Sequence, residues 1–126
     1  MVLVDTSVWI RAGAGRTPYA AELDRLLDLN QVVAHELVYG ELLMGDRGGR
    51  RKLLADYERM SYASLVSHDE VVALARERNL HGRGVGWIDV HLLASALIGR
   101  FRLWTADANF RAITREFGVD YRFGAE

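Results

Sequence analysis

The chain opens with the segment VLVDTSVWI at residues 2–10, and the start of this segment indicates the fold class. Val2, Leu3 and Val4 form a short apolar run rich in β-branched side chains, which is typical of a strand buried on both faces. Asp5 ends this run. Strands of this kind belong to parallel sheets that helices cover on both sides, so the segment predicts an α/β fold.

Four more short apolar segments alternate with amphipathic ones along the chain. The additional strands are predicted at residues 31–34, 63–66, 101–104 and 119–123. Helices are predicted at 18–30, 35–44, 51–62, 67–80, 87–98 and 107–117. Thr17 is an expected N-cap before Pro18, and Ser67 with Glu70 forms an expected capping box. This pattern predicts one domain over residues 1–126, with a five-stranded parallel sheet flanked by helices.

Composition limits the classes of function. The 126 residues contain 16 basic and 17 acidic side chains, so the net charge of −1 argues against a protein that coats DNA. A nuclease stays compatible with this balance, because its centre is acidic and its rim basic. No cysteine is present, which excludes disulfides, thiolate zinc sites and cysteine nucleophiles. The first residues lack the features of a signal peptide and no apolar run is long enough to span a membrane, so we expect a cytoplasmic protein.

Two acidic residues directly follow predicted strands. Asp5 comes after the strand at residues 2–4, and Asp107 follows the segment LWTA at 103–106. In open parallel sheets, reactive groups gather beyond the carboxyl ends of the strands, so both are candidate site residues. Each could instead be a helix or turn cap, since aspartate is common at both positions.

Two more acidic residues occur in apolar helical contexts. Asp89 is the one acidic residue in WIDVHLLASALI at 87–98, and it falls in the first turn, where the helix dipole favours a negative charge. Glu41 lies between Leu37 and Met44 at helical spacing, on a face that we expect to be buried. For Glu41 the alternative is a salt bridge to an arginine.

Four carboxylates that converge on one cleft would repel one another unless a cation joined them. Oxygen ligands suit Mg²⁺ or Mn²⁺, and Mg²⁺ is commonly shared with substrate phosphates. A zinc site is not expected, because the chain has no cysteine and its histidines show no HExxH-like spacing. The sequence therefore predicts a centre for a hard divalent cation.

Four segments that contain these acids occur together in one known family. They are VDTSVWI at 4–10, ELLMG at 41–45, the helix around Asp89, and TADANF at 105–110. In this order and at these spacings, they resemble the PIN-domain ribonucleases, specifically the VapC-type toxins of toxin–antitoxin pairs. The resemblance covers the whole chain. It implies a five-stranded parallel sheet, an acidic pocket that binds Mg²⁺ or Mn²⁺, an RNA substrate, a homodimer, and an antitoxin that occludes the pocket.

The resemblance also implies roles for individual residues. The catalytic quartet would comprise Asp5, Glu41, Asp89 and Asp107. Of these, Asp5, Asp89 and Asp107 would be metal ligands, and Glu41 would orient a water molecule. The supporting polar residues would be Thr6, Ser7, Thr105 and Asn109, with capping as an equal alternative for Asn109. The chemistry of phosphodiester hydrolysis agrees, because it requires an activated water and neutralised phosphate charge.

The RNA-binding surface is less clearly marked by the sequence. Arg47, Arg50 and Arg51 cluster before a predicted helix, and Arg83 lies in a glycine-rich loop. Arginine binds phosphate in a bidentate manner, but a solvated face explains either cluster equally well. Among the tryptophans, Trp87 is the candidate for base stacking, because it follows the glycine loop and precedes Asp89 by two residues.

The sequence also bears on three rival classes of protein. A phosphoacceptor receiver domain would need paired acids after the first strand and a late lysine, but the one lysine is Lys52. A haloacid-dehalogenase-like phosphatase would need an aspartate at position 7, where Ser7 stands. The serious alternative is a PIN fold that binds RNA or a protein without catalytic turnover. The intact set of four acids argues against that alternative.

Overall fold

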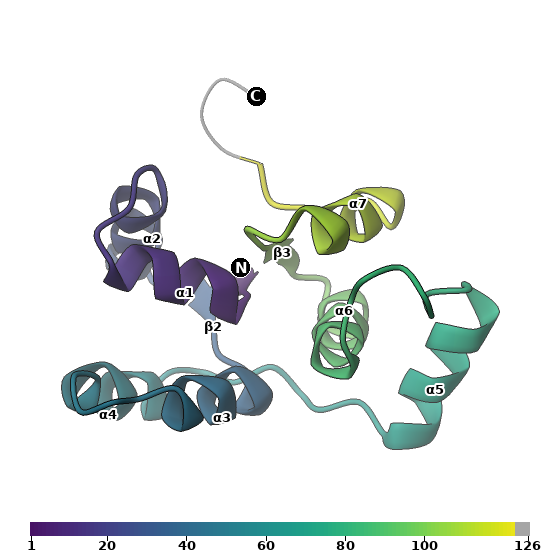
Figure 1. Cartoon of the computed structure of the whole chain (residues 1–126), viewed down its shortest axis with the longest axis horizontal. Helices are drawn as coiled ribbons and strands as arrows, with labels where there is room; N and C mark the ends of the chain where they lie inside the picture. The colour runs from purple at the N-terminus through teal and green to yellow at the C-terminus, as the bar shows by residue number, and fades with distance from the viewer. Residues whose placement is uncertain (123–126) are drawn as a thin grey trace.

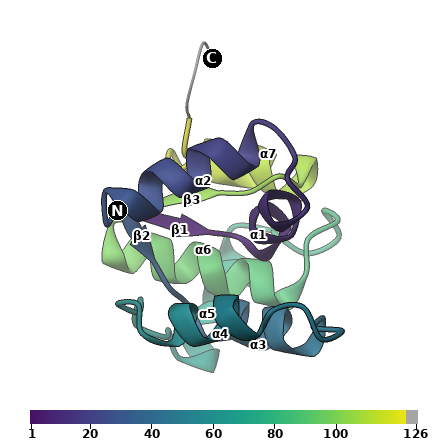
Figure 2. The ribbon, with the colours of Figure 1, turned by 90° about the vertical axis from the view of Figure 1, so that its left-hand side faces the viewer.

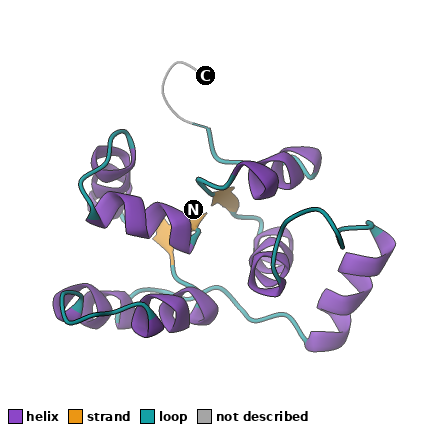
Figure 3. Cartoon of the chain, viewed as in Figure 1, coloured by secondary structure: helices purple, strands orange, loops and turns teal. Residues whose placement is uncertain are grey.

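The computed structural model describes residues 1–122, and a parallel sheet lies at its centre (Figures 1 and 3). The strands are β1 (Val2–Val4), β2 (Val32–Val33) and β3 (Arg102–Trp104), in the order β2-β1-β3. In the register, Leu3 pairs with Val33 on one side and with Leu103 on the other. Because β1 is central and all three of its residues are buried, the apolar opening segment forms the middle of the core. The α/β class is confirmed.

Seven helices surround this sheet in the described residues. They are α1 (Thr6–Gly13), α2 (Tyr19–Asp28), α3 (Glu36–Met44), α4 (Arg51–Glu58), α5 (His68–Glu77), α6 (Trp87–Gly99) and α7 (Ala108–Glu116). Helices α2 and α7 lie on one side of the sheet, while α6 and, beyond it, α3, α4 and α5 lie on the other (Figure 2). In residues 1–122, no helix has the length and apolar character needed to cross a membrane.

The local sequence explains where several helices begin and end. Ser67 accepts a hydrogen bond from the Glu70 amide at 3.3 Å and so caps α5 as expected. Asp107 does the same for α7, accepting from the Phe110 amide at 2.9 Å. After α6, Arg100 adopts the left-handed conformation, and a Cβ on Gly99 would lie 2.2 Å from the Phe101 ring. The small size of glycine at position 99 therefore lets Phe101 pack back against the helix.

The prediction of five strands was wrong, because the described chain has three. The expected strand at 63–66 is reduced to one bridge between Ala34 and Tyr62, and the expected last strand to one bridge between Leu103 and Asp120. Position 123 of that last strand lies outside the described residues. Beyond Ala63, the Ser64 carbonyl accepts from the Ser95 hydroxyl at 2.9 Å. That carbonyl is thus bound to α6 and cannot extend a ladder along β2, which is itself only two residues long.

The predicted helices differ from the structure at three points. No helix was predicted over α1, because threonine, serine, valine and tryptophan are weak helix formers. Val8 and Trp9 are buried, so tertiary packing outweighs this weak propensity. Thr17 does not cap α2: the helix begins after Pro18, with no side-chain cap. Helix α4 ends at Glu58, four residues earlier than expected.

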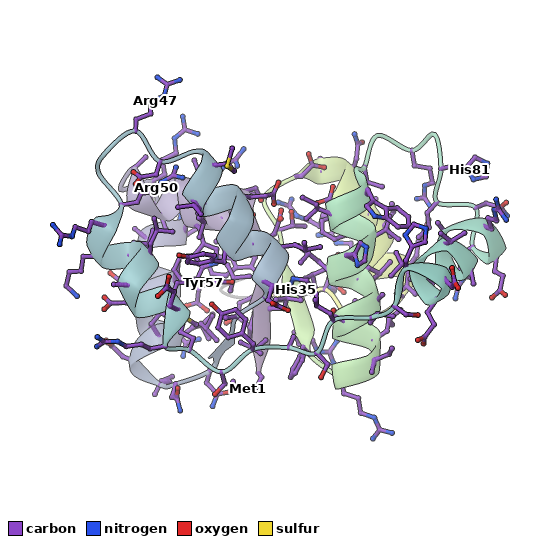
Figure 4. The ribbon with its side chains drawn as sticks, turned by 90° about the horizontal axis from the view of Figure 1, so that it is seen from below. Met1, His35, Arg47, Arg50, Tyr57 and His81 are labelled. Atoms are coloured by element: carbon purple, nitrogen blue, oxygen red, sulfur yellow. The ribbon has the colours of Figure 1, made fainter. Side chains whose placement is uncertain are left out.

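A fully buried histidine joins β2 to the helices below the sheet. His35 is 0% exposed and lies next to Tyr57 in the interior (Figure 4). Its Nδ1 accepts from the Leu37 amide at 3.1 Å, so Nδ1 carries no hydrogen and Nε2 donates to the Ser95 hydroxyl at 3.0 Å. Burial, with a smaller contribution from His91, lowers the pKa of His35 to about 4. The neutral ring is therefore part of the folded structure.

We expect this histidine to make stability depend on pH. The folded protein keeps His35 neutral down to about pH 4, whereas the unfolded chain takes up the proton near the ordinary pKa of 6.5. The contribution is fully present above pH 6.5 and is lost as the pH falls towards 4, by about 2–4 kcal/mol. Urea unfolding followed by tryptophan fluorescence should show a steeper loss of stability in the wild type than in His35→Asn. His81→Asn, a change at an exposed loop histidine, should keep the wild-type slope; equal slopes for wild type and His35→Asn would contradict this account.

Candidate active site

Asp5 lies at the centre of a hydrogen-bonded network that joins the carboxyl ends of β1 and β3. Its side chain is only 5% exposed, and its Oδ2 accepts from the Ser7 and Thr105 hydroxyls, each at 2.7 Å. Ser7 accepts in turn from the Ala106 amide at 3.0 Å, and Thr105 accepts from the Asp107 amide at 3.1 Å. Since each hydroxyl has one hydrogen, which it donates to Asp5, their 3.3 Å approach to each other is a contact and not a further bond.

The same network positions the carboxylates next to Asp5. Thr6 follows Asp5 in the chain and donates to Glu41 Oε1 at 2.7 Å, which links α1 to α3. Asp107 follows the loop after β3 and uses Oδ1 to cap α7, so the capping alternative holds for one oxygen of this residue. Asp107 is exposed, and the cap leaves its second oxygen available for another ligand.

Asp89 reaches the same region from the first turn of α6. Its Oδ2 accepts from the Gly86 amide at 3.0 Å, which holds the carboxylate at the helix N-terminus. Burial raises the pKa of Asp89 to about 6, although the hydrogen bond from Gly86 opposes the rise. The charges of Asp5, Glu41 and Asp107 raise this pKa further. Three of the predicted acids therefore act electrostatically on the fourth, Asp89, although they belong to separate segments of the chain.

The donors fit a hard divalent cation that is held loosely. In the described part of the chain, no three His, Asp or Glu side chains are close enough to form a preformed metal cage. Mg²⁺ does not need such a cage, because it keeps several waters and uses one or two carboxylates together with substrate phosphates. Both hydroxyls donate to Oδ2 of Asp5, and in residues 1–122 its Oδ1 receives no hydrogen bond. An oxygen ligand is thus free at the most rigid point of the site.

Known proteins match this chain over nearly its whole length. The family described as "PIN domain" matches residues 2–116. The chain is 42% identical over 123 residues to "Ribonuclease VapC32" of Mycobacterium tuberculosis, from strains CDC 1551 and H37Rv, with 94% of both chains covered. The crystal structure of PAE2754 from Pyrobaculum aerophilum is similar with a TM-score of 0.58 and 19% identity, covering 88% of this chain and 82% of that one. The chain belongs to the VapC-type PIN-domain ribonucleases.

Within this PIN domain, Glu41 differs from its expected environment. We expected its helix face to be buried, but Glu41 is exposed and Met44, one turn further along, is 85% exposed. The apolar face of α3 instead contains the buried residues Val38 and Leu42. The alternative of a salt bridge for Glu41 also finds no support, since in the described residues it forms no ion pair. Thr6 is the residue that fixes its position.

Asn109 lies beside the glycine-rich loop that precedes α6. A Cβ on Gly84 would approach Asn109 Nδ2 to 2.5 Å, and Gly84 has a φ of +82°. The positive φ explains why a glycine is favoured there, and the absence of a Cβ leaves room for the Asn109 amide. In the PIN domain, the amide of Asn109 therefore packs against the loop that positions the start of α6, and its capping role is not seen.

The four predicted RNA-binding arginines lie in different surroundings. Arg50 donates to the Leu42 carbonyl at 2.8 Å and so binds the end of α3. Arg83 forms a bidentate ion pair with Glu116, at 2.8 and 2.9 Å. Arg47 and Arg51 are exposed, and Arg47 points away from the protein (Figure 4). Two of the four residues are therefore already engaged within the PIN domain.

Two other arginines, which the sequence analysis did not select, lie next to the Asp5 network. Arg11 in α1 donates to the Ser7 carbonyl at 3.1 Å, and Arg111 in α7 reaches the Thr105 carbonyl at 3.4 Å. Both are half-buried. Their spacing of four and six residues from the network hydroxyls is visible in the sequence, but it became informative only once α1 and α7 were known.

Trp87 is 43% exposed at the first position of α6. Its ring centroid lies 5.1 Å from that of His91, with the two rings perpendicular, and 5.5 Å from that of His68, with the two rings tilted. These contacts hold the ring between α5 and α6 while part of it faces solvent. Trp9 and Trp104 are buried and belong to the core.

The raised pKa predicts that Asp89 lowers the stability of the metal-free protein. The unfolded chain loses this proton near the ordinary pKa of 3.8, whereas the folded protein keeps it to about pH 6. The contribution of Asp89 to folding is therefore most favourable below pH 3.8 and is lost as the pH rises through 6. In EDTA at pH 7.5, Asp89→Asn should raise the free energy of unfolding by about 1–2 kcal/mol, discounted for partial exposure.

The comparison needs a matched control and a second pH. Asp24→Asn alters an exposed acid on α2 and should leave the free energy of unfolding unchanged. The gain from Asp89→Asn should disappear below pH 4, where wild-type Asp89 is protonated in both states. Asp89→Asn protein that is less stable than wild type at pH 7.5 would show that the hydrogen bond from Gly86 outweighs burial and repulsion.

Proposed function

We propose that this chain is the toxin of a toxin–antitoxin pair and hydrolyses internal phosphodiester bonds of RNA at the Asp5–Asp89 centre. The observation that carries the proposal is the geometry of the carboxylates: Ser7 and Thr105 hold Asp5, Thr6 holds Glu41, and the Gly86 amide holds Asp89, each on a separate segment of the chain. Like charges in one partly buried place lower stability unless a cation joins them. The relatives named "Ribonuclease VapC32", at 42% identity, support RNA as the substrate.

The proposed role of each residue follows from its surroundings in the site. Asp5 and Asp89 would hold Mg²⁺ or Mn²⁺, with Asp107 completing the ligand set directly or through a water. A bound ion of this kind neutralises phosphate charge and lowers the pKa of an attacking water. Glu41, fixed by the hydroxyl of Thr6, would orient the water for attack. Ser7 and Thr105 would keep Asp5 in place through their bonds to Oδ2.

An antitoxin is the second part of the proposal. An acidic centre with a free carboxylate oxygen is complementary to a guanidinium, which donates two parallel hydrogen bonds to a carboxylate. We therefore propose that a segment of the antitoxin places an arginine against the centre and blocks both metal and RNA. We further propose a homodimer, a cytoplasmic location and one domain over residues 1–126, in line with the family resemblance.

Cleavage of total cellular RNA by the purified protein tests the function. Wild-type protein with Mg²⁺ or Mn²⁺ should cleave RNA at internal positions, and EDTA should stop the reaction. Asp5→Asn and Asp89→Asn should each reduce the rate by more than about 100-fold, because each removes a charge that holds the ion. Circular dichroism should show that both variants are folded.

Asp24→Asn is the control here too, since it removes one acidic charge far from the centre and should cleave like wild type. Metal-dependent cleavage that survives both Asp5→Asn and Asp89→Asn would contradict the proposed site. Folded wild-type protein that binds metal and RNA but never cleaves would favour a binding module without turnover.

The antitoxin contact predicts a charge-reversal effect. Replacing the docking arginine of the antitoxin with glutamate should place two like charges together and abolish inhibition of RNA cleavage. Replacing an arginine elsewhere on the antitoxin should leave inhibition intact. Full inhibition by every single arginine-to-glutamate variant would contradict an arginine in the acidic centre.

A further inference from the structure

A small cavity lies directly behind the Asp5 network, between the start of α2, the end of β3, and α7. Its volume is about 160 Å³. Its polar lining includes Tyr19, Thr105, Arg111, Arg115 and Asp120. The Tyr19 ring, which lines one side of the cavity, is held by two contacts. Its centroid lies 6.0 Å from that of the stacked Trp104 ring and 5.9 Å from the Arg11 guanidinium carbon. The cavity is thus rigid on one side and positively charged on the other.

Arg111 is the unusual residue of this cavity. It is half-buried, and in residues 1–122 no carboxylate lies within ion-pair distance of it. Its side chain donates one long hydrogen bond, of 3.4 Å, to the Thr105 carbonyl. A guanidinium carries five N–H donors, and removing them from water is unfavourable without an anion or other acceptors. The Arg111 guanidinium is therefore available to an anion that enters the cavity.

The rest of the cavity does not cancel this charge. Asp120 is the acidic residue of the lining, and two other arginines already share it: Arg122 at 2.7 Å and Arg115 at 3.7 Å. Its pKa is lowered mainly by the hydrogen bond from Arg122, so the carboxylate is ionised and compensated. The Thr114 hydroxyl donates to the Arg111 carbonyl at 2.9 Å and does not reach the guanidinium.

Thr105 connects the cavity to the acidic centre. Its hydroxyl donates to Asp5 at 2.7 Å, and its carbonyl accepts from Arg111 on the cavity side. One residue therefore separates a group that attracts a cation from a group that attracts an anion. A nucleic acid strand could use both groups. The phosphate at the cleaved bond would lie with its cation at the acidic centre, and the phosphate of the next nucleotide would lie at Arg111.

We propose that Arg111, assisted by Arg115, binds the RNA phosphate next to the one that is cleaved, and so sets the position of the strand in the site. The inference rests on the proposed function, since it takes RNA as the substrate. It replaces Arg50 and Arg83 as the phosphate contacts. Arg111 is a positioning residue in this proposal, because it binds the substrate away from the reacting atoms.

Kinetics on a single-stranded RNA substrate test the role of Arg111. Arg111→Gln should raise KM at least about tenfold and leave kcat within about twofold, because the bond contributes to binding and not to chemistry. The slope of log(kcat/KM) against log[KCl] should become shallower by about 0.7, as expected when one contact to a single-stranded phosphate is lost. Arg111→Lys should restore the slope, because it keeps the charge, while only partly restoring KM.

Arg59→Ala is the matched control, since it removes an exposed arginine at the end of α4 and should keep the wild-type KM and slope. Thermal unfolding confirms that each variant is folded. Arg111→Gln protein with wild-type KM and slope would overturn the proposal. A fall in kcat at unchanged KM and slope would overturn it as well, because Arg111 would then act only by holding Thr105.

The proposed function and this inference can fail separately. Wild-type protein that cleaves no RNA contradicts the nuclease function. In that case fluorescence anisotropy with the same RNA measures binding and its salt dependence directly, and Arg111→Gln should lower the slope by the same amount of about 0.7. An unchanged binding slope would overturn the phosphate contact, whatever the outcome of the cleavage assay.

Discussion

The carboxylate of Asp5, with one oxygen bound by two hydroxyls, is the constraint on which the site depends. Ser7 and Thr105 come from segments nearly a hundred residues apart, and each gives its single hydrogen to Asp5 Oδ2. Each can then only accept, and the amides of Ala106 and Asp107 fill that role. Every hydrogen-bond donor of these two hydroxyls thus has an acceptor around a carboxylate that is only 5% exposed. A buried polar group without a hydrogen-bond partner there would lower stability by about 1–3 kcal/mol. The network fixes the ends of β1 and β3 together, and α1 and α7 begin from it.

This arrangement brings charges together at a cost to the metal-free fold. Three carboxylates act on Asp89 in addition to its burial, and its pKa rises to about 6 as a result. A core built for stability alone would not place three acids where their charges act on a partly buried fourth, whereas a site for a divalent cation uses carboxylates from several segments. The exposed positions of Glu41 and Asp107 keep the site open, which suits an ion that retains waters and shares a phosphate.

The sequence was sufficient for the parts of the fold that depend on local patterns. The run at Val2–Val4, the cap at Ser67 and the apolar helix at Trp87–Gly99 follow from burial and capping. The choice of four acids from segments next to apolar runs stays a prediction, and the charges of three of them act on Asp89. Sequence patterns could not predict the features that depend on tertiary contacts. Helix α1 forms from weak helix formers because Val8 and Trp9 are buried. Two expected strands are reduced to single bridges. The ion pair of Arg83 with Glu116 joins residues 33 apart, so its phosphate-binding role could not be judged from its neighbours.

The Asp5 carboxylate and the Arg111 guanidinium lie on opposite sides of Thr105. These opposite charges explain how a small domain could bind RNA, a polyanion, at an acidic centre. Carboxylates alone repel RNA, and a bound cation corrects this only at the phosphate that it touches. Arg111 offers a second attraction on the other side of Thr105, in the cavity that Tyr19 also lines. The carboxylates and the Arg111 guanidinium would each gain a partner when ion and RNA bind. Ligands that bind only the folded state stabilise it, so the substrate and ion should complete the charge balance that the chain leaves open.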